Sequence, residues 1–260
     1  SMSVGFTLSN PWIFGTVLND PTKAGSSSPY TYTYPKSAGL PKTPRTIQVE
    51  VGYDGATADI VRTAKGCLVN TFSLNAAVGG LVDCTVDITY GSESAPSTSL
   101  TTPPALPSVE FPYTFAHAEL YFAGQLVTQC QDASISIAQN TELLYGLNSN
   151  QAVDSFRRVL SMTGSFRASW VDKDLLEKLL AQIKKDTSTT YQETVGGGAT
   201  EFRLTFEKSA TEKIVVSMTG LGINDLSISG IEPVEPVFEE ITWTAKTISV
   251  VATSTVSAEE

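Results

Sequence analysis

Two stretches of the chain decide its fold: Gly66–Tyr90 (GCLVNTFSLNAAVGGLVDCTVDITY) and Asp132–Ser149 (DASISIAQNTELLYGLNS). In both, apolar and polar residues alternate with a period of two, and glycine or asparagine punctuates them. This alternation is typical of half-buried antiparallel strands. One face of the second strand in the first stretch carries only acidic and hydroxyl side chains, those of Asp83, Thr85, Asp87 and Thr89.

The same alternation extends outward from these stretches in both directions. It predicts further strands at residues 46–51, 60–74, 111–122, 125–137, 157–170, 201–207, 214–218, 226–228 and 238–253. One segment has the helical period instead: Asp172 is a good N-cap, and leucines recur on one face over about 173–185. The predicted fold is mainly β, an antiparallel β-sandwich or barrel with one flanking α-helix.

The chain divides into an arm and one large domain. Residues 1–44 contain six prolines among aromatic residues, which excludes long helices and central strands. We expect an extended N-terminal arm that docks on a neighbouring surface, or else a loop packed on its own domain. Residues 45–260 are expected to form a single β domain with a loop at 91–107 and a helix-loop segment at 172–200.

Composition narrows the classes of function. The 260 residues carry a net charge of −10, which is unfavourable for a nucleic-acid clamp because such clamps neutralise phosphates with Lys and Arg. No apolar run reaches the length of a membrane span, and no signal peptide is recognisable at the start. The sequence predicts a soluble protein made in a cytoplasm.

Residues able to support catalysis or metal binding are few. His117 is the one histidine, so a triad or a two-histidine metal site is hard to build, and the three cysteines form no CxxC. Three cysteines are compatible with a Cys67–Cys84 cross-strand disulfide and also with buried free thiols. The glycines at 196–198 lack the Lys-Ser/Thr of a phosphate loop. We therefore expect no catalytic residue, cofactor or metal.

Four segments together resemble the tail tube proteins of long-tailed viruses of bacteria and archaea, the major tail protein family. They are CLVNTFSLNAAVGGLVDCTVDITYG, PYTFAHAELYFAG, DASISIAQNTELLYGLNS and the strand containing MTGSF, within roughly residues 45–250. The first 44 residues and 187–200 fit nothing in that pattern.

The resemblance implies a structural protein of the virion tail. Its subunits would form sixfold rings whose inner sheets close into one shared β-barrel, and the rings would stack into a tube for genome delivery. The implied partners are further copies of the chain, other tail proteins and double-stranded DNA in non-specific transit, with no membrane. The face of Asp83, Thr85, Asp87 and Thr89 is the candidate lumen wall.

Contacts between rings are expected from the N-terminal arm and from the loops at 91–107 and 187–200. The arm's candidate contact residues are its aromatics, Trp12, Phe14, Tyr30, Tyr32 and Tyr34. Three alternatives stay open at this point: an adhesin-like β-sandwich binding module, the tube of a related contractile injection device, and an enzyme with an acid/base carboxylate pair.

Overall fold

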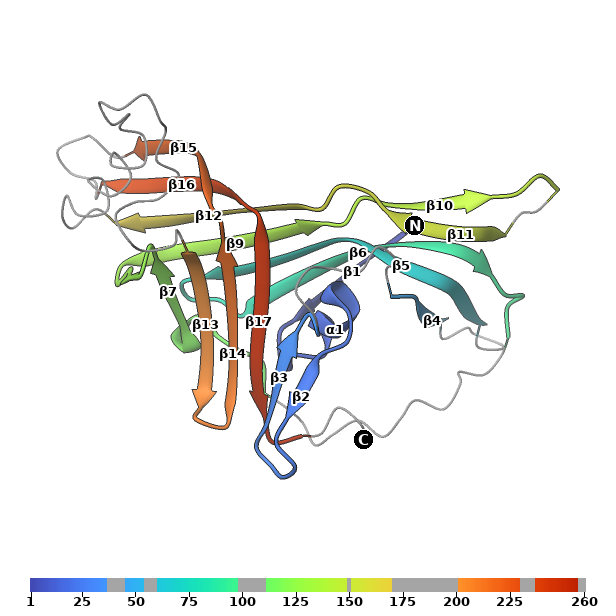
Figure 1. Cartoon of the computed structure of the whole chain (residues 1–260), viewed down its shortest axis with the longest axis horizontal. Coiled ribbons are helices and arrows are strands. Elements are labelled where there is room, and N and C mark those ends of the chain that lie inside the picture. The colour runs from blue at the N-terminus through green and yellow to red at the C-terminus, as the bar shows by residue number, and fades with distance from the viewer. Residues whose placement is uncertain are drawn as a thin grey trace.

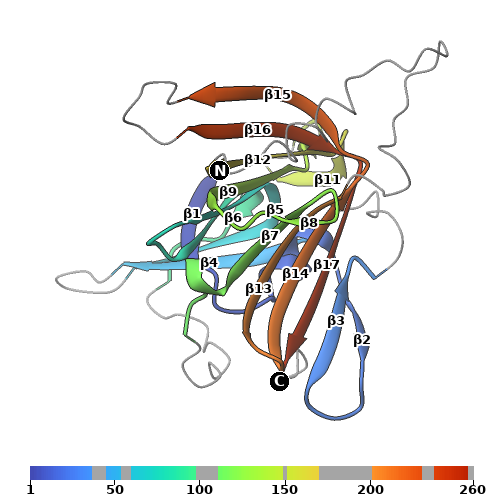
Figure 2. The same ribbon diagram turned by 90° about the vertical axis from the view of Figure 1, so that its left-hand side faces the viewer.

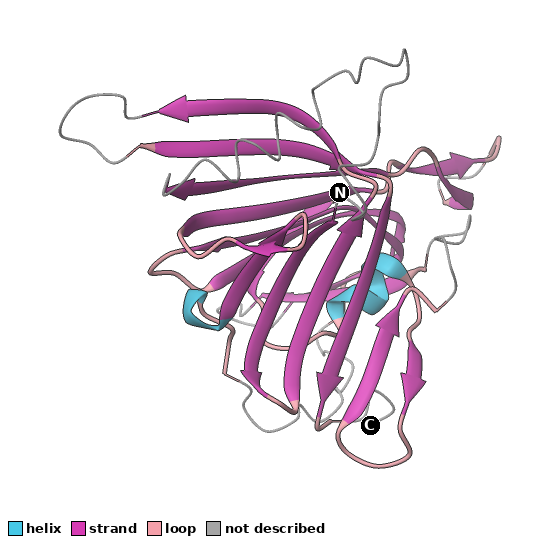
Figure 3. Cartoon of the chain, turned by 60° about the vertical axis from the view of Figure 1, so that its left-hand side comes forward, coloured by secondary structure: helices cyan, strands magenta, loops and turns pink. Residues whose placement is uncertain are grey.

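The computed structural model describes residues 1–36, 45–53, 60–97, 111–148, 151–169, 201–229 and 237–256. The expected helix at 173–185, the loop at 187–200 and most of the loop at 91–107 lie outside these ranges. Within them the chain is mainly β and antiparallel, as predicted from the alternating stretches (Figure 1). Figure 3 shows how little helix the described part contains: α1 (Ile13–Leu18) and one 3-10 turn, η1 (Phe115–His117).

The larger sheet has eight strands in the order β1-β6-β5-β9-β12-β16-β15, with β4 beside the first half of β5. Its strands are β1 (Met2–Thr7), β4 (Ile47–Tyr53), β5 (Ile60–Ala77), β6 (Val82–Glu93), β9 (Cys130–Ala138), β12 (Ser161–Ser169), β15 (Gly222–Ser229) and β16 (Phe238–Ala245). We call it the large sheet. It contains both stretches that decided the fold.

The second sheet has seven strands in the order β2-β3-β17-β14-β13-β7-β8 and packs against one face of the large sheet (Figure 1). Its strands are β2 (Thr22–Ala24), β3 (Tyr30–Tyr34), β7 (Ala118–Phe122), β8 (Gln125–Leu126), β13 (Glu201–Ser209), β14 (Glu212–Thr219) and β17 (Thr247–Ser254). A separate ribbon of β10 (Thr141–Tyr145) and β11 (Ala152–Arg157) extends the β9–β12 hairpin.

Two chain segments pass from one sheet to the other. The single strand expected at 238–253 is instead two strands, because Ala245 pairs in the large sheet and Thr247 in the second. Lys246 makes the corner, and its amide donates to the Thr219 carbonyl at 3.1 Å. Beside it β14 turns into β15 at Gly220, whose φ of +69° suits glycine. Figure 2 shows this shared corner, with β15 and β16 on one side and β14 and β17 on the other.

The core lies between the two sheets. Trp243 of β16 is fully buried and contacts Phe202 of β13, with ring centroids 4.5 Å apart. Phe166 of β12 contacts Phe122 of β7 at 5.1 Å. The inward side chains of the alternating strands supply these rings, and burying each such side chain stabilises the fold by roughly 1.5–3 kcal/mol.

The N-terminal segment is not the extended arm that its prolines suggested. β1 pairs with β6, and β3 pairs with β17 at the edge of the second sheet. The alternating tyrosines of β3 place two rings, Tyr32 and Tyr34, in the core of the same chain. Strand pairing with distant segments explains the difference, because the prolines fall outside β1 and β3.

The segment at 111–122 is also less regular than predicted. Only Ala118–Phe122 is a strand, and η1 precedes it. His117 ends this turn, where its Nδ1 accepts a hydrogen bond from the Thr114 amide at 3.0 Å. The histidine therefore has a structural role in the described fold.

Candidate functional site: a polar sheet face, two sheet edges and an apolar hairpin

The outward face of the large sheet carries short polar side chains in rows that run across its strands. One row, from β1 to β15, is Gly5, Thr85, Ser73, Ser136, Thr163, Thr244 and Gly222. The next row is Thr7, Asp83, Asn75, Ser134, Ser165, Thr242 and Asp225. The hydroxyls of Ser134 and Ser165 lie 2.9 Å apart, which fits side chains that share one face. We call this surface the polar face.

The predicted lumen residues all lie on the polar face. Asp83, Thr85 and Asp87 are exposed on β6, and Thr89 is half-buried. Thr89 lies opposite the fully buried Leu68, close to the end of β6 where the β10–β11 ribbon crosses. The structure thus brings these four residues together on one strand, with the first three open to solvent.

The strand order of the large sheet ends at two lateral edges, β1 and β15, and β4, whose described partner is β5, has a further unpaired edge. Within the described ranges, β1 pairs with β6 alone and β15 with β16 alone. Val4 of β1 lies on the core-facing side of the strand but is 40% exposed, because no further strand covers it there. Unpaired edges of this kind are templates for pairing with another chain.

The β10–β11 ribbon, the apolar hairpin hereafter, carries large exposed side chains near its turn. Leu147 is fully exposed at the turn, and Val153 and Tyr145 are 68% and 56% exposed. Glycine and asparagine were expected to punctuate this stretch, but the exposed apolar residues beside them were not predicted. The signal was available, since apolar residues flank a glycine- and asparagine-rich turn at 146–148.

Buried hydrogen bonds fix the base of the apolar hairpin. Arg157 Nη2 donates to Gln139 Oε1 at 2.6 Å, and Gln139 Nε2 donates to the Val17 carbonyl of α1, also at 2.6 Å. Gln139 is 1% exposed, and burial lowers the pKa of Arg157. Thr141 donates its amide to Asn70 Oδ1 at 3.1 Å. The hairpin therefore leaves the domain in a defined direction.

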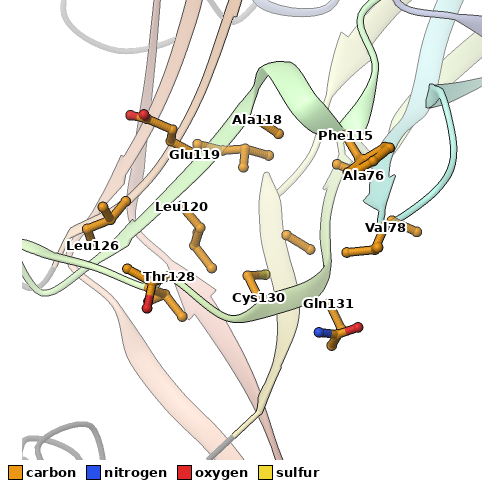
Figure 4. Close-up of a pocket in the computed structure, with 14 residues that line it drawn as sticks. Ala76, Val78, Phe115, Ala118, Glu119, Leu120, Leu126, Thr128, Cys130 and Gln131 are labelled. Carbon is orange, nitrogen blue, oxygen red and sulfur yellow. The ribbon is translucent and has the colours of Figure 1, made fainter. Parts of the chain in front are cut away.

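An apolar cleft of about 280 Å³ lies at the opposite end of β9 (Figure 4). It opens between the end of β5 and the start of β9 in the large sheet and β7 and β8 in the second sheet. Leu120, Leu126, Val78, Phe115 and Cys130 are among its lining residues. Leu126, Phe115 and Val78 are 46%, 43% and 55% exposed, so apolar surface surrounds the cleft as well as lining it.

The aromatic residues that were predicted to contact a neighbouring ring of subunits pack, to different degrees, within the monomer. Phe14, Tyr32 and Tyr34 are at most 1% exposed in the core of their own chain, which leaves them no surface to contact a neighbouring ring of subunits. Trp12 and Tyr30 are half-buried beside Tyr32. Contact between rings stays a prediction for these two residues alone.

The cysteines are free thiols. In the β5–β6 register Cys67 lies opposite Tyr90 and Cys84 opposite Leu74, so this hairpin does not bring the two together. Burial raises the pKa of both Cys84 and Cys130 to about 12. Across the described ranges, no three His, Cys, Asp or Glu residues gather in a way that could hold a metal ion. Nor is any helix in those ranges long and apolar enough to cross a membrane.

Comparison with known proteins gives the family. The model of the family described as "Phage tail tube protein" matches residues 1–245, which include the first 44 residues that the sequence resemblance left out. Curated proteins gave no match. Because the family match spans nearly the whole chain and agrees with the antiparallel β fold, the protein belongs to the phage tail tube protein family and is a structural component of the virion tail.

Proposed function

We propose that the chain is a tail tube subunit that assembles into rings, and that the rings stack into the conduit for the viral genome. The observation that carries this proposal is the polar face, an unbroken set of short polar side chains that crosses the large sheet between two unpaired edges. A solvated wall inside a tube needs such a face, with the opposite face buried.

The charge of the polar face suits the passage of DNA. Acidic side chains outnumber basic ones on the strands of this face: the register places Asp83, Asp87, Asp132, Asp225 and Glu240 there, with Arg167 of β12 between Asp132 and Glu240. Phosphates are held by Lys and Arg and repelled by carboxylates, so an acidic or neutral wall lets a duplex slide without binding. We propose that Asp83, Thr85, Asp87 and Thr89 face the lumen.

Ring closure would use the two edges of the large sheet. Pairing of β1 in one subunit with β15 in the next would extend the sheet around the ring and remove both of these lateral edges. Six subunits per ring is the number that the family resemblance implies. The subunits would be made in the host cytoplasm and would meet other tail proteins at the ends of the tube. The family match supports this structural role over the adhesin-like module and over an enzyme.

A matched pair of substitutions on β1 tests ring closure. Val4→Lys places a charge on the core-facing side, where the neighbouring strand would cover it, and should give monomers. Ser3→Lys places the same charge on the polar face and should leave rings intact. Native mass spectrometry measures both. Rings of normal size from Val4→Lys would show that β1 is not the joint, and wild-type chain that stays monomeric at every concentration would refute ring formation itself.

A further inference from the structure

The apolar hairpin exposes large apolar side chains, and their exposure to water does not stabilise an isolated subunit. Leu147, Val153, Tyr145 and Leu144 stand at its end, with exposed fractions from 41% to 103%. Large exposed apolar patches mark interaction sites in soluble proteins. A two-stranded ribbon is also marginally stable alone, so packing its end against another surface would stabilise it.

The cleft and the hairpin lie at opposite ends of the same strands. Cys130 at the start of β9 lines the cleft, and Thr141, which begins the hairpin, follows shortly after β9 ends. The nine residues of β9 rise about 30 Å in between. Figure 1 shows β7 and the start of β9 at the left end of the molecule and β10–β11 at the right end.

We propose that the tip of the apolar hairpin of one subunit inserts into the apolar cleft of a subunit in the next ring. This inference rests on the proposed function. If the lateral edges β1 and β15 close the ring, the ends of the strands are the surfaces left to join one ring to another. A contact between two different surfaces of identical subunits generates an open filament when each contact advances along an axis and no ring is closed, and an open filament is the symmetry a tube requires.

The chemistry of the two surfaces is complementary. The cleft offers apolar walls for the leucine, valine and tyrosine side chains of the tip. Among the described residues that line it, Glu119 carries the charge, and the exposed tip residues Leu147, Val153 and Tyr145 carry none.

The fixed base of the hairpin favours such docking. Its hydrogen bonds through Gln139 and Arg157 to α1 hold the ribbon before any partner arrives. A preorganised segment loses less conformational entropy on binding than a flexible loop does. The docked tip would also exclude water from apolar surface on both partners.

Charge substitution at the tip tests the proposal in the full-length chain. Leu147→Asp should abolish stacking while rings still form, because a carboxylate would enter an apolar cleft. Val251→Asp is the matched control: Val251 is 36% exposed on the outer face of β17, away from the cleft, and this variant should form tubes of wild-type length. Negative-stain electron microscopy distinguishes rings from tubes. Normal tubes from Leu147→Asp would overturn the inference and leave ring assembly standing.

Cross-linking gives an independent readout of the same contact. In a Cys130→Ser background, Leu147→Cys chain is mixed with Leu126→Cys chain, assembled and oxidised. A covalent dimer between the two variants is expected, whereas Leu147→Cys mixed with Val251→Cys should give none. Equal yields in the two mixtures would overturn the inference. Wild-type chain that forms neither rings nor tubes would instead count against the proposed function.

Discussion

Among the described glycines, Gly164 has the least room for a side chain. It lies on the core-facing side of β12, directly opposite Trp243 of β16. A Cβ atom at this position would be 2.3 Å from Trp243 Cζ2 and 2.6 Å from the Ser134 carbonyl oxygen. Carbon atoms in contact normally lie about 3.5–4.0 Å apart. The indole ring would have to move by more than about 1 Å, and Phe202 behind it blocks that movement.

The expected loss of stability in Gly164→Ala follows from this overlap. Adding atoms to a packed core costs about 1–3 kcal/mol, and the close approach here places Gly164→Ala in the upper part of that range. Loss of unfolded-state entropy offsets roughly 0.4–1 kcal/mol of this cost. We expect a net destabilisation of about 2 kcal/mol. For a chain of this size the melting temperature should fall by roughly 4–8 °C.

The assay is urea unfolding followed by tryptophan fluorescence, with thermal unfolding as a second measure. Gly5→Ala is the matched control, because no atom lies within 4 Å of the place that its Cβ atom would take, and its stability should change by less than about 0.5 kcal/mol. In a double variant, Trp243→Phe removes the ring atoms that clash and should make Gly164→Ala less costly. If Gly164→Ala unfolds at the same urea concentration as Gly5→Ala, the close packing of Gly164 on Trp243 is refuted.

Three further predictions concern the polar face, the hairpin base and the thiols. Asp83→Lys combined with Asp87→Lys should preserve tubes but slow DNA ejection in a reconstituted tail, since lysines bind phosphates; unchanged ejection would place these residues outside the lumen. Arg157→Leu should lower the free energy of unfolding by about 1–3 kcal/mol, because it leaves the buried Gln139 Oε1 without its donor. The control Arg158→Leu should change the free energy of unfolding by less than about 0.5 kcal/mol. Equal effects of the two substitutions would contradict the role given to the hairpin base. The folded chain keeps the proton on Cys84 up to its pKa of about 12, while the unfolded chain loses it near pH 8.5. The free energy of unfolding should therefore fall as pH rises above about 8.5, and it should fall less steeply in Cys84→Ala. Parallel pH profiles of the two proteins would contradict this.

Strands with an unbroken period of two were predictable from the sequence. Val82–Tyr90 and Asp132–Ile137 alternate cleanly, and the structure has strands there with the expected buried faces. The polar character of the face containing Asp83 and Asp87 followed from the same alternation. These features depend only on residues that are close in sequence.

The rest depends on which distant segments meet. The β3 tyrosines alternate as a strand should, but their pairing with β17, more than 200 residues away, has no local signal. The break at Lys246 arises because the chain changes sheets. The inward apolar positions shift there from odd numbers (Ile241, Trp243) to even numbers (Ile248, Val250), a change of phase that the expectation of one long strand did not use. The cleft is made by four strands that the strand order brings together, so no single stretch of sequence indicates it.

Whether the chain builds a tube can be seen directly by negative-stain electron microscopy of the purified chain over a rising series of concentrations. We expect rings first and then hollow tubes that lengthen as concentration increases. Particles of single-subunit size at every concentration would contradict it.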